Sequence, residues 1–304
     1  MQLTEIASGL RFPEGPIWMA DGTIVLVEIA RGTLSRVHPD GRVEVVAETG
    51  GGPNGAAVGP DGRVWVCNNG GFEWIEAGGL LVPGHQPDDY QGGSIQVVDL
   101  ASGAVETLYT ECDGLPLRAP NDIVFDEHGG FWFTDHGKAR ARERDRTGVF
   151  HAAADGSKIT EVVFPLEAPN GIALSPDGAR LYVAETPTGR VYAFDVVGPG
   201  EISRSPLGVN GGVPLYGAPP PRMFDSMAVD GAGHVCVATL VQGGITVIDP
   251  NDGSGELLET DDPLTTNICF GGEGLRTAFL TLSGTGRLAS VEWPRPGLAL
   301  AHSA

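Results

Sequence analysis

The stretch APNDIVFDEHGGFWFTD, residues 119–135, decides the fold that we expect for this chain. It holds two runs of β-forming residues, IVF and FWF, on either side of the turn-forming segment DEHGG. Two such runs around a glycine-containing turn predict a β-hairpin. Because a hairpin returns to the face from which it starts, Asn121 at its beginning should lie near Asp135 and His136 at its end.

The same hairpin pattern occurs six times along the chain. Each copy opens with an acidic or amide residue, continues with an apolar run, turns at a short segment that contains Gly, and ends with a second apolar run. The opening residues, which we call the anchors, are Glu14, Asn54, Asn121, Asn170, Asp225 and Asn267. A repeat every 40 to 70 residues or so is typical of the blades of a β-propeller.

The repeats predict an all-β fold, a six-bladed β-propeller of four-stranded antiparallel blades that occupies residues 1–304 as a single domain. The 46 Gly and 23 Pro supply turns, and 41% hydrophobic residues supply a core. The last repeat is one strand short, whereas residues 3–7 form a strand that precedes the first repeat. We therefore expect the N-terminal strand to join the last blade and close the ring, which also pairs an edge that would otherwise be exposed.

The expected strand directions gather the anchors at one end of the central channel. Each innermost strand starts at its anchor, so the short turns of the first hairpins fall on the opposite face. Four long segments should connect strands at the anchor face: Phe72–Gly92, Glu111–Pro120, His136–Thr147 and Gly198–Phe224. Of these, Phe72–Gly92 and Gly198–Phe224 should cover a binding site there. The mixed-charge run Lys138–Arg146 is most simply a solvated loop.

Four of the anchors predict a metal site. Glu14, Asn121, Asn170 and Asp225 begin innermost strands, so two carboxylates and two amide oxygens can face one point on the channel axis. Such hard oxygen ligands favour one divalent cation, Ca²⁺ first, with Mg²⁺, Mn²⁺, Fe²⁺ or Zn²⁺ as alternatives. The competing interpretation is that each anchor is an ordinary turn residue, because Asn-Gly and Asp-Gly are frequent in turns.

Charge and cysteine content restrict the partners and the compartment. A formal net charge of −20 and a pI near 4.6 would repel the phosphates of nucleic acids and anionic membranes, so a small neutral ligand or a cation fits better. We expect a monomer or weak dimer. The four Cys lack C-x-x-C spacing, no secretory signal is visible at the N-terminus, and no apolar stretch reaches membrane-spanning length. These features predict reduced thiols and a cytoplasmic protein.

Several motifs give the chain a resemblance to a known family across essentially its whole length. They are FPEGPIW at 12–18, PND at 120–122 with FWFTD at 131–135, PNG at 169–171, DSM at 225–227, and TN at 266–267 with FGG at 270–272. Together they resemble the SMP-30/gluconolactonase/luciferin-regenerating-enzyme-like proteins, six-bladed propellers that include regucalcin. The resemblance implies hydrolysis of a lactone or related ester, and it implies the same four metal ligands: Glu14, Asn121, Asn170 and Asp225.

The resemblance also suggests catalytic roles. The cation would polarise the ring carbonyl while a carboxylate takes a proton from the attacking water. Asp225 resembles the residue that has the base or nucleophile role in the family. Asp135 and His136 are the rival bases, because their hairpin returns them to the anchor face.

The substrate contacts involve two departures from the family. In regucalcin-like members an Arg two positions before the third-blade anchor contacts substrate, whereas here Arg118 is three positions before Asn121. His136 follows Asp135 where the family commonly has Pro. We expect Asn54, Arg118, Asn121 and His136 to bind the substrate.

Three functions from different classes fit these residues. The leading one is metal-dependent hydrolysis of a lactone, with a sugar lactone such as gluconolactone as the substrate. The alternatives are a related propeller hydrolase that acts on another ester or a phosphotriester, and a non-catalytic Ca²⁺-binding propeller. A screen of lactones with and without a chelator discriminates among them.

Overall fold

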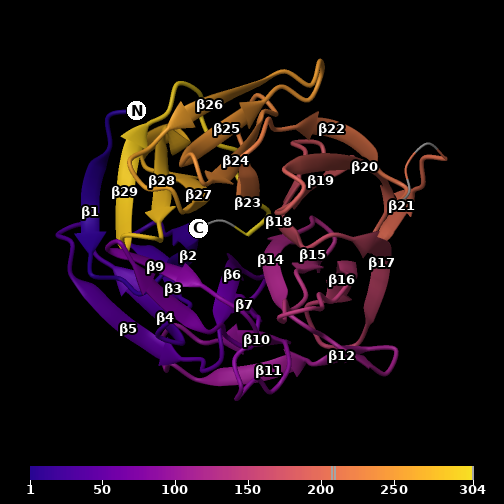
Figure 1. The fold of residues 1–304 in the computed structure, drawn as a ribbon, viewed down its shortest axis with the longest axis horizontal. Helices are drawn as coiled ribbons and strands as arrows, with labels where there is room; N and C mark the ends of the chain where they lie inside the picture. The colour runs from indigo at the N-terminus through magenta and orange to yellow at the C-terminus, as the bar shows by residue number, and fades with distance from the viewer. Residues whose placement is uncertain (207, 209, 303–304) are drawn as a thin grey trace.

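The computed structural model describes residues 1–206, 208 and 210–302, and it shows six antiparallel sheets arranged in a ring (Figure 1). The predicted six-bladed β-propeller is therefore confirmed. Each sheet is one blade, and the anchors lie in the innermost strands. No helix in the described part of the chain is long and apolar enough to cross a membrane.

The blades contain the following strands. Blade one has β2 (Pro13–Trp18), β3 (Ile24–Glu28), β4 (Thr33–Val37) and β5 (Val43–Glu48); blade two has β6 (Pro53–Val58), β7 (Val64–Asn68), β10 (Ser94–Val98) and β11 (Val105–Tyr109). Blade three has β14 (Pro120–Phe125), β15 (Gly130–Asp135), β16 (Thr147–Ala153) and β17 (Ile159–Leu166); blade four has β18 (Pro169–Leu174), β19 (Arg180–Glu185), β20 (Arg190–Gly198), β21 (Glu201–Ser203) and β22 (Val213–Gly217). Blade five has β23 (Met223–Val229), β24 (Val235–Leu240), β25 (Gly244–Ile248) and β26 (Gly255–Glu259); blade six has β27 (Thr265–Gly271), β28 (Thr277–Leu282), β29 (Arg287–Glu292) and β1 (Thr4–Ser8).

The N-terminal strand closes the ring as expected. β1 pairs antiparallel with β29, so the last blade has the strand order β27, β28, β29, β1. Figure 1 shows the indigo β1 beside the yellow β29. The two ends of the chain therefore share one sheet, and the outer edge of β29 is paired.

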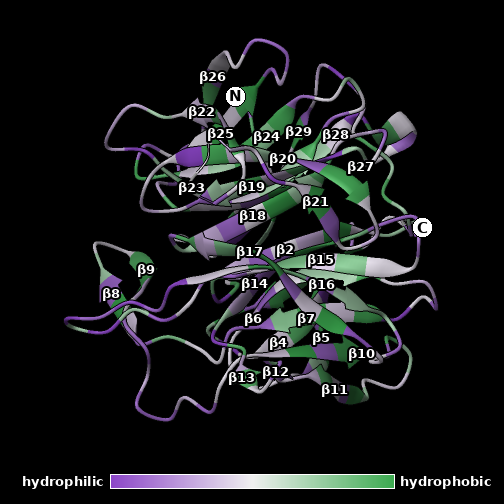
Figure 2. Cartoon of the chain, turned by 90° about the vertical axis from the view of Figure 1, so that its right-hand side faces the viewer, coloured by the Kyte–Doolittle hydropathy of each residue, from purple (hydrophilic) through white to green (hydrophobic). Residues whose placement is uncertain are grey.

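One of the two long segments expected to cover the anchor face is instead part of a blade. The segment after β7 forms a small hairpin, β8 (Trp74–Ala77) and β9 (Leu80–Pro83), which projects from one face of the disc (Figure 2). The expectation that Gly198–Phe224 also covers this face is wrong, because β21 and β22 both pair with β20. They form an outer strand of blade four that is interrupted between its two parts, and this interruption hid the strand pattern in the sequence.

Two minor elements complete the fold. A second hairpin, β12 (Glu111–Cys112) and β13 (Leu115–Pro116), precedes blade three, and a 3₁₀ turn spans Glu273–Leu275 in blade six. Neither belongs to the ring of sheets. The hairpin lies in the connection from β11 to β14, and the 3₁₀ turn lies in the turn from β27 to β28.

The blades pack against each other through aromatic and aliphatic side chains. Trp65 of β7 lies edge-on to Phe125 of β14 with ring centroids 5.4 Å apart, so blades two and three share one core. Trp132 and Tyr182 hold the corresponding places in blades three and four and are also buried. The expectation that these aromatics form inter-blade core is confirmed, and their burial supplies much of the apolar contact between blades.

Candidate active site

Every innermost strand carries one extra residue at its anchor. In β14, Pro120 pairs with Asp135 and Ile123 pairs with Phe133, so three steps along β14 match two along β15. The innermost strands of the other five blades show the same shift in register at the anchor. A β-bulge of this kind re-aims side chains and is frequent beside active sites. The interpretation of the anchors as ordinary turn residues is therefore wrong, because they lie in bulged strands.

The glycine that follows some anchors allows neighbouring blades to approach each other. A Cβ atom added to Gly55 would lie 2.5 Å from the backbone oxygen of Asn121, and one added to Gly171 would lie 2.6 Å from that of Asp225. Gly15 meets the anchor backbone of blade two in the same way. Only glycine fits where another backbone comes this close. The anchors thus form a ring around the channel.

This close approach leads to a stability prediction. Gly55→Ala should destabilise the fold by about 1–3 kcal/mol or more, because the new methyl group would overlap backbone atoms of blade three. The matched control is Gly217→Ala in the outer strand β22, where an added Cβ would meet no atom of the described residues within 4 Å. Urea unfolding measures both variants. Equal losses in the two variants would contradict the steric argument.

Four anchors form a connected polar cluster. The Oε2 atom of Glu14 accepts hydrogen bonds from Asn267 Nδ2 and from the N–H of Gly15, each 2.7 Å long. The side chain of Asn170 donates to the carboxylate of Asp225, and the negative charge of Asp225 raises the pKa of Glu14. Burial raises the pKa of Asp225 to about 7. Burial, together with the charge of Asp225, raises the pKa of Glu14 well above its ordinary value.

The cluster has acceptors without donors. Glu14 Oε1 and Asn121 Oδ1 are buried and have no hydrogen-bond partner in the part of the chain that the structure describes. Nor does any Lys or Arg of the described residues form an ion pair with Glu14 or Asp225. A buried and a half-buried carboxylate without cationic partners, together with oxygens that lack donors, fit a divalent cation, which binds hard oxygen ligands.

The candidate ligand set is a mixed one. Among the described residues, no three His, Cys, Asp or Glu side chains gather into a group that could hold a metal ion. The predicted set instead combines the carboxylates of Glu14 and Asp225 with the amides of Asn121 and Asn170. Amide and carboxylate oxygens together suit Ca²⁺ better than the softer metals.

The two substrate-binding candidates on the ring are neighbours. Asn54 and Asn121 are both buried, with 5% and 4% of their surface exposed. They begin adjacent innermost strands, and Gly55 brings the two backbones into contact. Both side chains therefore belong to the same sector of the anchor ring.

Asp135 is hydrogen-bonded to the backbone. Its buried carboxylate accepts N–H groups from Arg118 and Ala119, both at 2.7 Å, and from Gly137 at 2.9 Å. Burial raises the pKa of Asp135, and these bonds oppose the rise. The arrangement fits a residue that shapes the chain just before Asn121. The side chain of Arg118 itself is exposed.

His136 is held in its neutral form. Burial, with the charges of Arg144 and Lys138, lowers the pKa of His136 to about 3. One ring nitrogen bonds the backbone of Pro169, whereas Nδ1 is buried and has no partner among the described residues. Nδ1 can accept a hydrogen bond from a substrate hydroxyl, but a group with so low a pKa is a weak base.

Asp122 is a channel residue that the sequence pattern did not single out. Its buried carboxylate accepts N–H groups from Ile123 at 3.0 Å and from Ile172 at 3.3 Å. Burial raises the pKa of Asp122 to about 7. The available signal was the pair Asn-Asp at 121–122, where blades two and four have Asn-Gly. A side chain at this position ties β14 to β18, which a glycine cannot do.

The expectation that Lys138–Arg146 is a solvated loop is wrong for Lys138, which is 1% exposed. Its ammonium donates to the carbonyl of Gly71 over 2.5 Å and lies 4.2 Å from the ring centroid of Phe72 and 5.4 Å from that of Tyr90. Burial lowers the pKa of this Lys to about 7. Lys138 thus fastens the segment after β7 onto blade three. A single buried Lys within a run of charges gives no sequence signal.

Fold and site together define a class of protein, the six-bladed propeller with a ring of polar anchors at one end of its channel. The chain matches the SMP-30/Gluconolactonase/LRE-like region over residues 12–284, and it belongs to this family. It is 28% identical to a gluconolactonase of Zymomonas mobilis, over 91% of this chain and 78% of that protein. It is 30% identical to lactonase drp35 of Staphylococcus saprophyticus, over 78% of this chain and 66% of that protein.

Solved structures share the architecture. A gluconolactonase from Xanthomonas campestris superposes with a TM-score of 0.74 at 24% identity, covering 96% of this chain and 89% of its own. Regucalcin from Agrobacterium tumefaciens, a calcium-binding protein, superposes with a TM-score of 0.71 at 19% identity, covering 96% and 95%. Structural similarity at this level of sequence identity shows a shared fold, and that fold is the six-bladed ring described above.

Proposed function

We propose that this protein is a metal-dependent lactonase that opens a sugar lactone such as gluconolactone at the anchor end of its channel. The broader statement rests on the family, because its relatives include gluconolactonase and lactonase, and the chain is a lactone-hydrolysing enzyme on this ground. The observation that supports metal dependence is the pair of carboxylates, Glu14 buried and Asp225 half-buried, beside two acceptors that lack donors.

Glu14, Asn121, Asn170 and Asp225 would hold one divalent cation, with Ca²⁺ favoured by the oxygen-only set. When bound, the cation polarises the lactone carbonyl and stabilises the charge that develops on its oxygen. The charge of Asp225 raises the pKa of Glu14, so a positive charge between the two carboxylates is favourable.

Asp225 would act as the general base. The oxygen of the attacking water bonds to the carbonyl carbon while a proton passes to the Asp225 carboxylate, the ring C–O bond then breaks, and the proton is returned to the ring oxygen to give a hydroxy acid. The side chain of Asn170 donates to Asp225 and orients it. The pKa of about 7 is that of the cation-free site, and a bound cation would lower it, so that Asp225 is ionised and able to accept a proton at neutral pH.

Other residues would bind the substrate. The Nδ1 atom of His136 is free to accept from a sugar hydroxyl, and the exposed guanidinium of Arg118 can donate to one. Asn54 and Asn121 add amides in the adjacent sector of the ring. Asp135 would hold the backbone that carries Arg118 rather than meet the substrate.

A pH-indicator assay tests this function. Purified protein is treated exhaustively with a chelator, and hydrolysis of sugar, aliphatic and aromatic lactones is followed before and after addition of Ca²⁺, Mg²⁺, Mn²⁺ or Zn²⁺. Cation-dependent acid release from at least one sugar lactone is expected. Full activity after chelation would contradict the metal dependence. Hydrolysis of an aryl ester or phosphotriester without hydrolysis of any lactone would contradict the proposed substrate class.

We also place the enzyme in the cytoplasm as a monomer or weak dimer with a small-molecule partner. The support is chemical: all four cysteines are free thiols, and Cys67, Cys112 and Cys236 are buried. Buried reduced thiols suit a reducing compartment.

A further inference from the structure

We propose that the channel has a second binding site, at the end opposite the anchors, for an uncharged and largely apolar small molecule. A cavity of about 470 Å³ lies there, within the size range of small-molecule sites. Of the six anchors only Asn267, to which we give no metal or substrate role, is among the described residues that line it. Asp122 lines its inner end, so this carboxylate lies between the cavity and the anchor ring.

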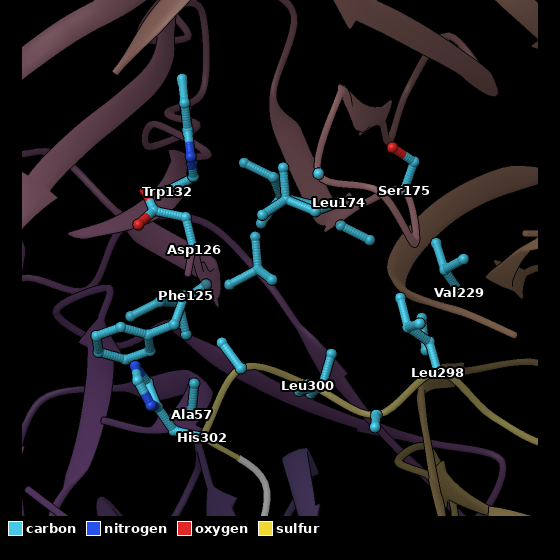
Figure 3. A pocket seen from close by; sticks show the side chains of 18 of the residues that line it. Ala57, Phe125, Asp126, Trp132, Leu174, Ser175, Val229, Leu298, Leu300 and His302 are labelled. Atoms are coloured by element: carbon cyan, nitrogen blue, oxygen red, sulfur yellow. The ribbon is translucent and has the colours of Figure 1, made fainter. Parts of the chain in front are cut away.

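Most of the residues that line this cavity are apolar. Figure 3 shows Phe125, Leu174 and Val229, which come from innermost strands or the chain just at their ends, and Leu298 and Leu300, which come from the C-terminal segment. Apolar cavities of this size gain free energy when an apolar ligand replaces poorly bonded water. The cavity therefore favours aromatic or aliphatic groups.

The C-terminal segment, residues 294–302, crosses the mouth of the channel. The Arg295 guanidinium pairs with the buried Asp230 carboxylate, and the N–H of Leu298 donates to the carbonyl of Val229 over 3.1 Å. At the other end, His302 lies edge-on to Phe125 with ring centroids 5.2 Å apart. Figure 1 shows the yellow end of this segment near the centre of the ring. This segment lies outside residues 12–284, the part that matches the family.

The entrance beside the segment is open and apolar. Val197 and Leu300 line the cavity, yet 63% and 55% of their surface is exposed. Large exposed apolar side chains at the rim of a cavity are typical of a ligand site. A ligand can therefore enter without unfolding of the C-terminal segment.

The polar groups restrict the ligand further. Asp126 is bonded to His151 over 2.8 Å and Ser175 to Asp177 over 2.6 Å, so these groups are already satisfied. The buried Nε2 of His302 has no partner among the described residues. One hydrogen-bonding group on the ligand would satisfy it.

Charge excludes anions from this site, and the largely apolar lining excludes sugars. Four acidic side chains line the cavity, and the described lining residues include no Lys or Arg; the acidic ones are Asp122, Asp126, Glu127 and Asp177. A sugar lactone or its hydroxy acid would leave several hydroxyl groups unpaired against apolar walls. The ligand class is thus a neutral phenol or alcohol, and the inference does not depend on the proposed function.

Titration calorimetry with 4-ethylphenol tests the site, with gluconate as the anionic control probe. One saturable site per chain is expected for the phenol and none for gluconate. Ala57→Phe should abolish binding, because a phenyl ring at this lining position fills the cavity. His302→Phe keeps the ring on Phe125 but removes the hydrogen bond, so it should weaken binding roughly 2- to 10-fold. Lactone hydrolysis should be unchanged in both variants.

The location is checked by variants of the other end of the channel. Asp225→Asn and addition of a chelator should leave phenol binding unchanged. Thermal unfolding measures whether Ala57→Phe is folded. If it is not, the proposal is tested with His302→Phe and with removal of residues 298–304. The removal should weaken phenol binding more than His302→Phe does. Absence of saturable binding by the wild type, or binding that Asp225→Asn abolishes and the cavity variants leave intact, would overturn the proposal.

Discussion

Asp225→Asn is expected to lower kcat/KM for the best lactone by about 10²-fold or more while the bound cation is largely retained. Asn keeps one oxygen ligand and nearly the same volume, but it removes the carboxylate that would take the proton. Steady-state kinetics, together with metal analysis of the same preparation, separates loss of the base from loss of the cation. Parallel losses of metal and activity would show that Asp225 acts mainly as a ligand.

His136→Asn is the matched comparison. It should cost much less and act mainly by raising KM, because a His with a pKa of about 3 is a weak base whereas its Nδ1 can accept from substrate. The opposite pattern, an active Asp225→Asn with metal bound and an inactive His136→Asn, would assign the base to His136. The family would then account for the fold and the cation but not for the proton transfer.

The propeller could be predicted because its signal is local and repeated. Each blade needs a hairpin whose turn contains Gly and whose strands are apolar, so six copies of one pattern define six sheets without any long-range information. Ring closure followed from counting strands in the last repeat. The split outer strand of blade four escaped the same reasoning, because a strand interrupted by a loop has no continuous alternation.

The site could be predicted only in part, for a physical reason. The anchors stand at the start of every inner strand, so their convergence on the channel follows from topology alone. Asp122 and Lys138 depend on contacts with other blades: one carboxylate binds the backbone of β18, and one ammonium binds a carbonyl after β7. Such contacts leave no mark in the local sequence. The cavity beneath the C-terminal segment is likewise a product of the closed ring.

Glu14→Gln should change stability and activity in opposite directions. In the cation-free protein the charge of the half-buried Asp225 raises the pKa of the buried Glu14. Gln removes this repulsion and can still accept from Asn267 and Gly15, so the cation-free variant should unfold at higher temperature than the cation-free wild type. Lactone hydrolysis should nevertheless fall to background, because a ligand carboxylate is lost. Thermal unfolding and the indicator assay measure the two effects.

The stability of the wild type should depend on pH and on the bound cation. Both carboxyl groups have a raised pKa in the fold, so the cation-free wild type should lose stability as the pH rises from about 4, where unfolded carboxyl groups titrate, through about 7, the pKa of Asp225. Ca²⁺ at about 100 times its Kd should restore ~2.7 kcal/mol to the wild type and much less to Glu14→Gln. If the cation-free wild type is equally stable at pH 5 and pH 8, or if Ca²⁺ stabilises both proteins alike, Glu14 and Asp225 do not share a cation.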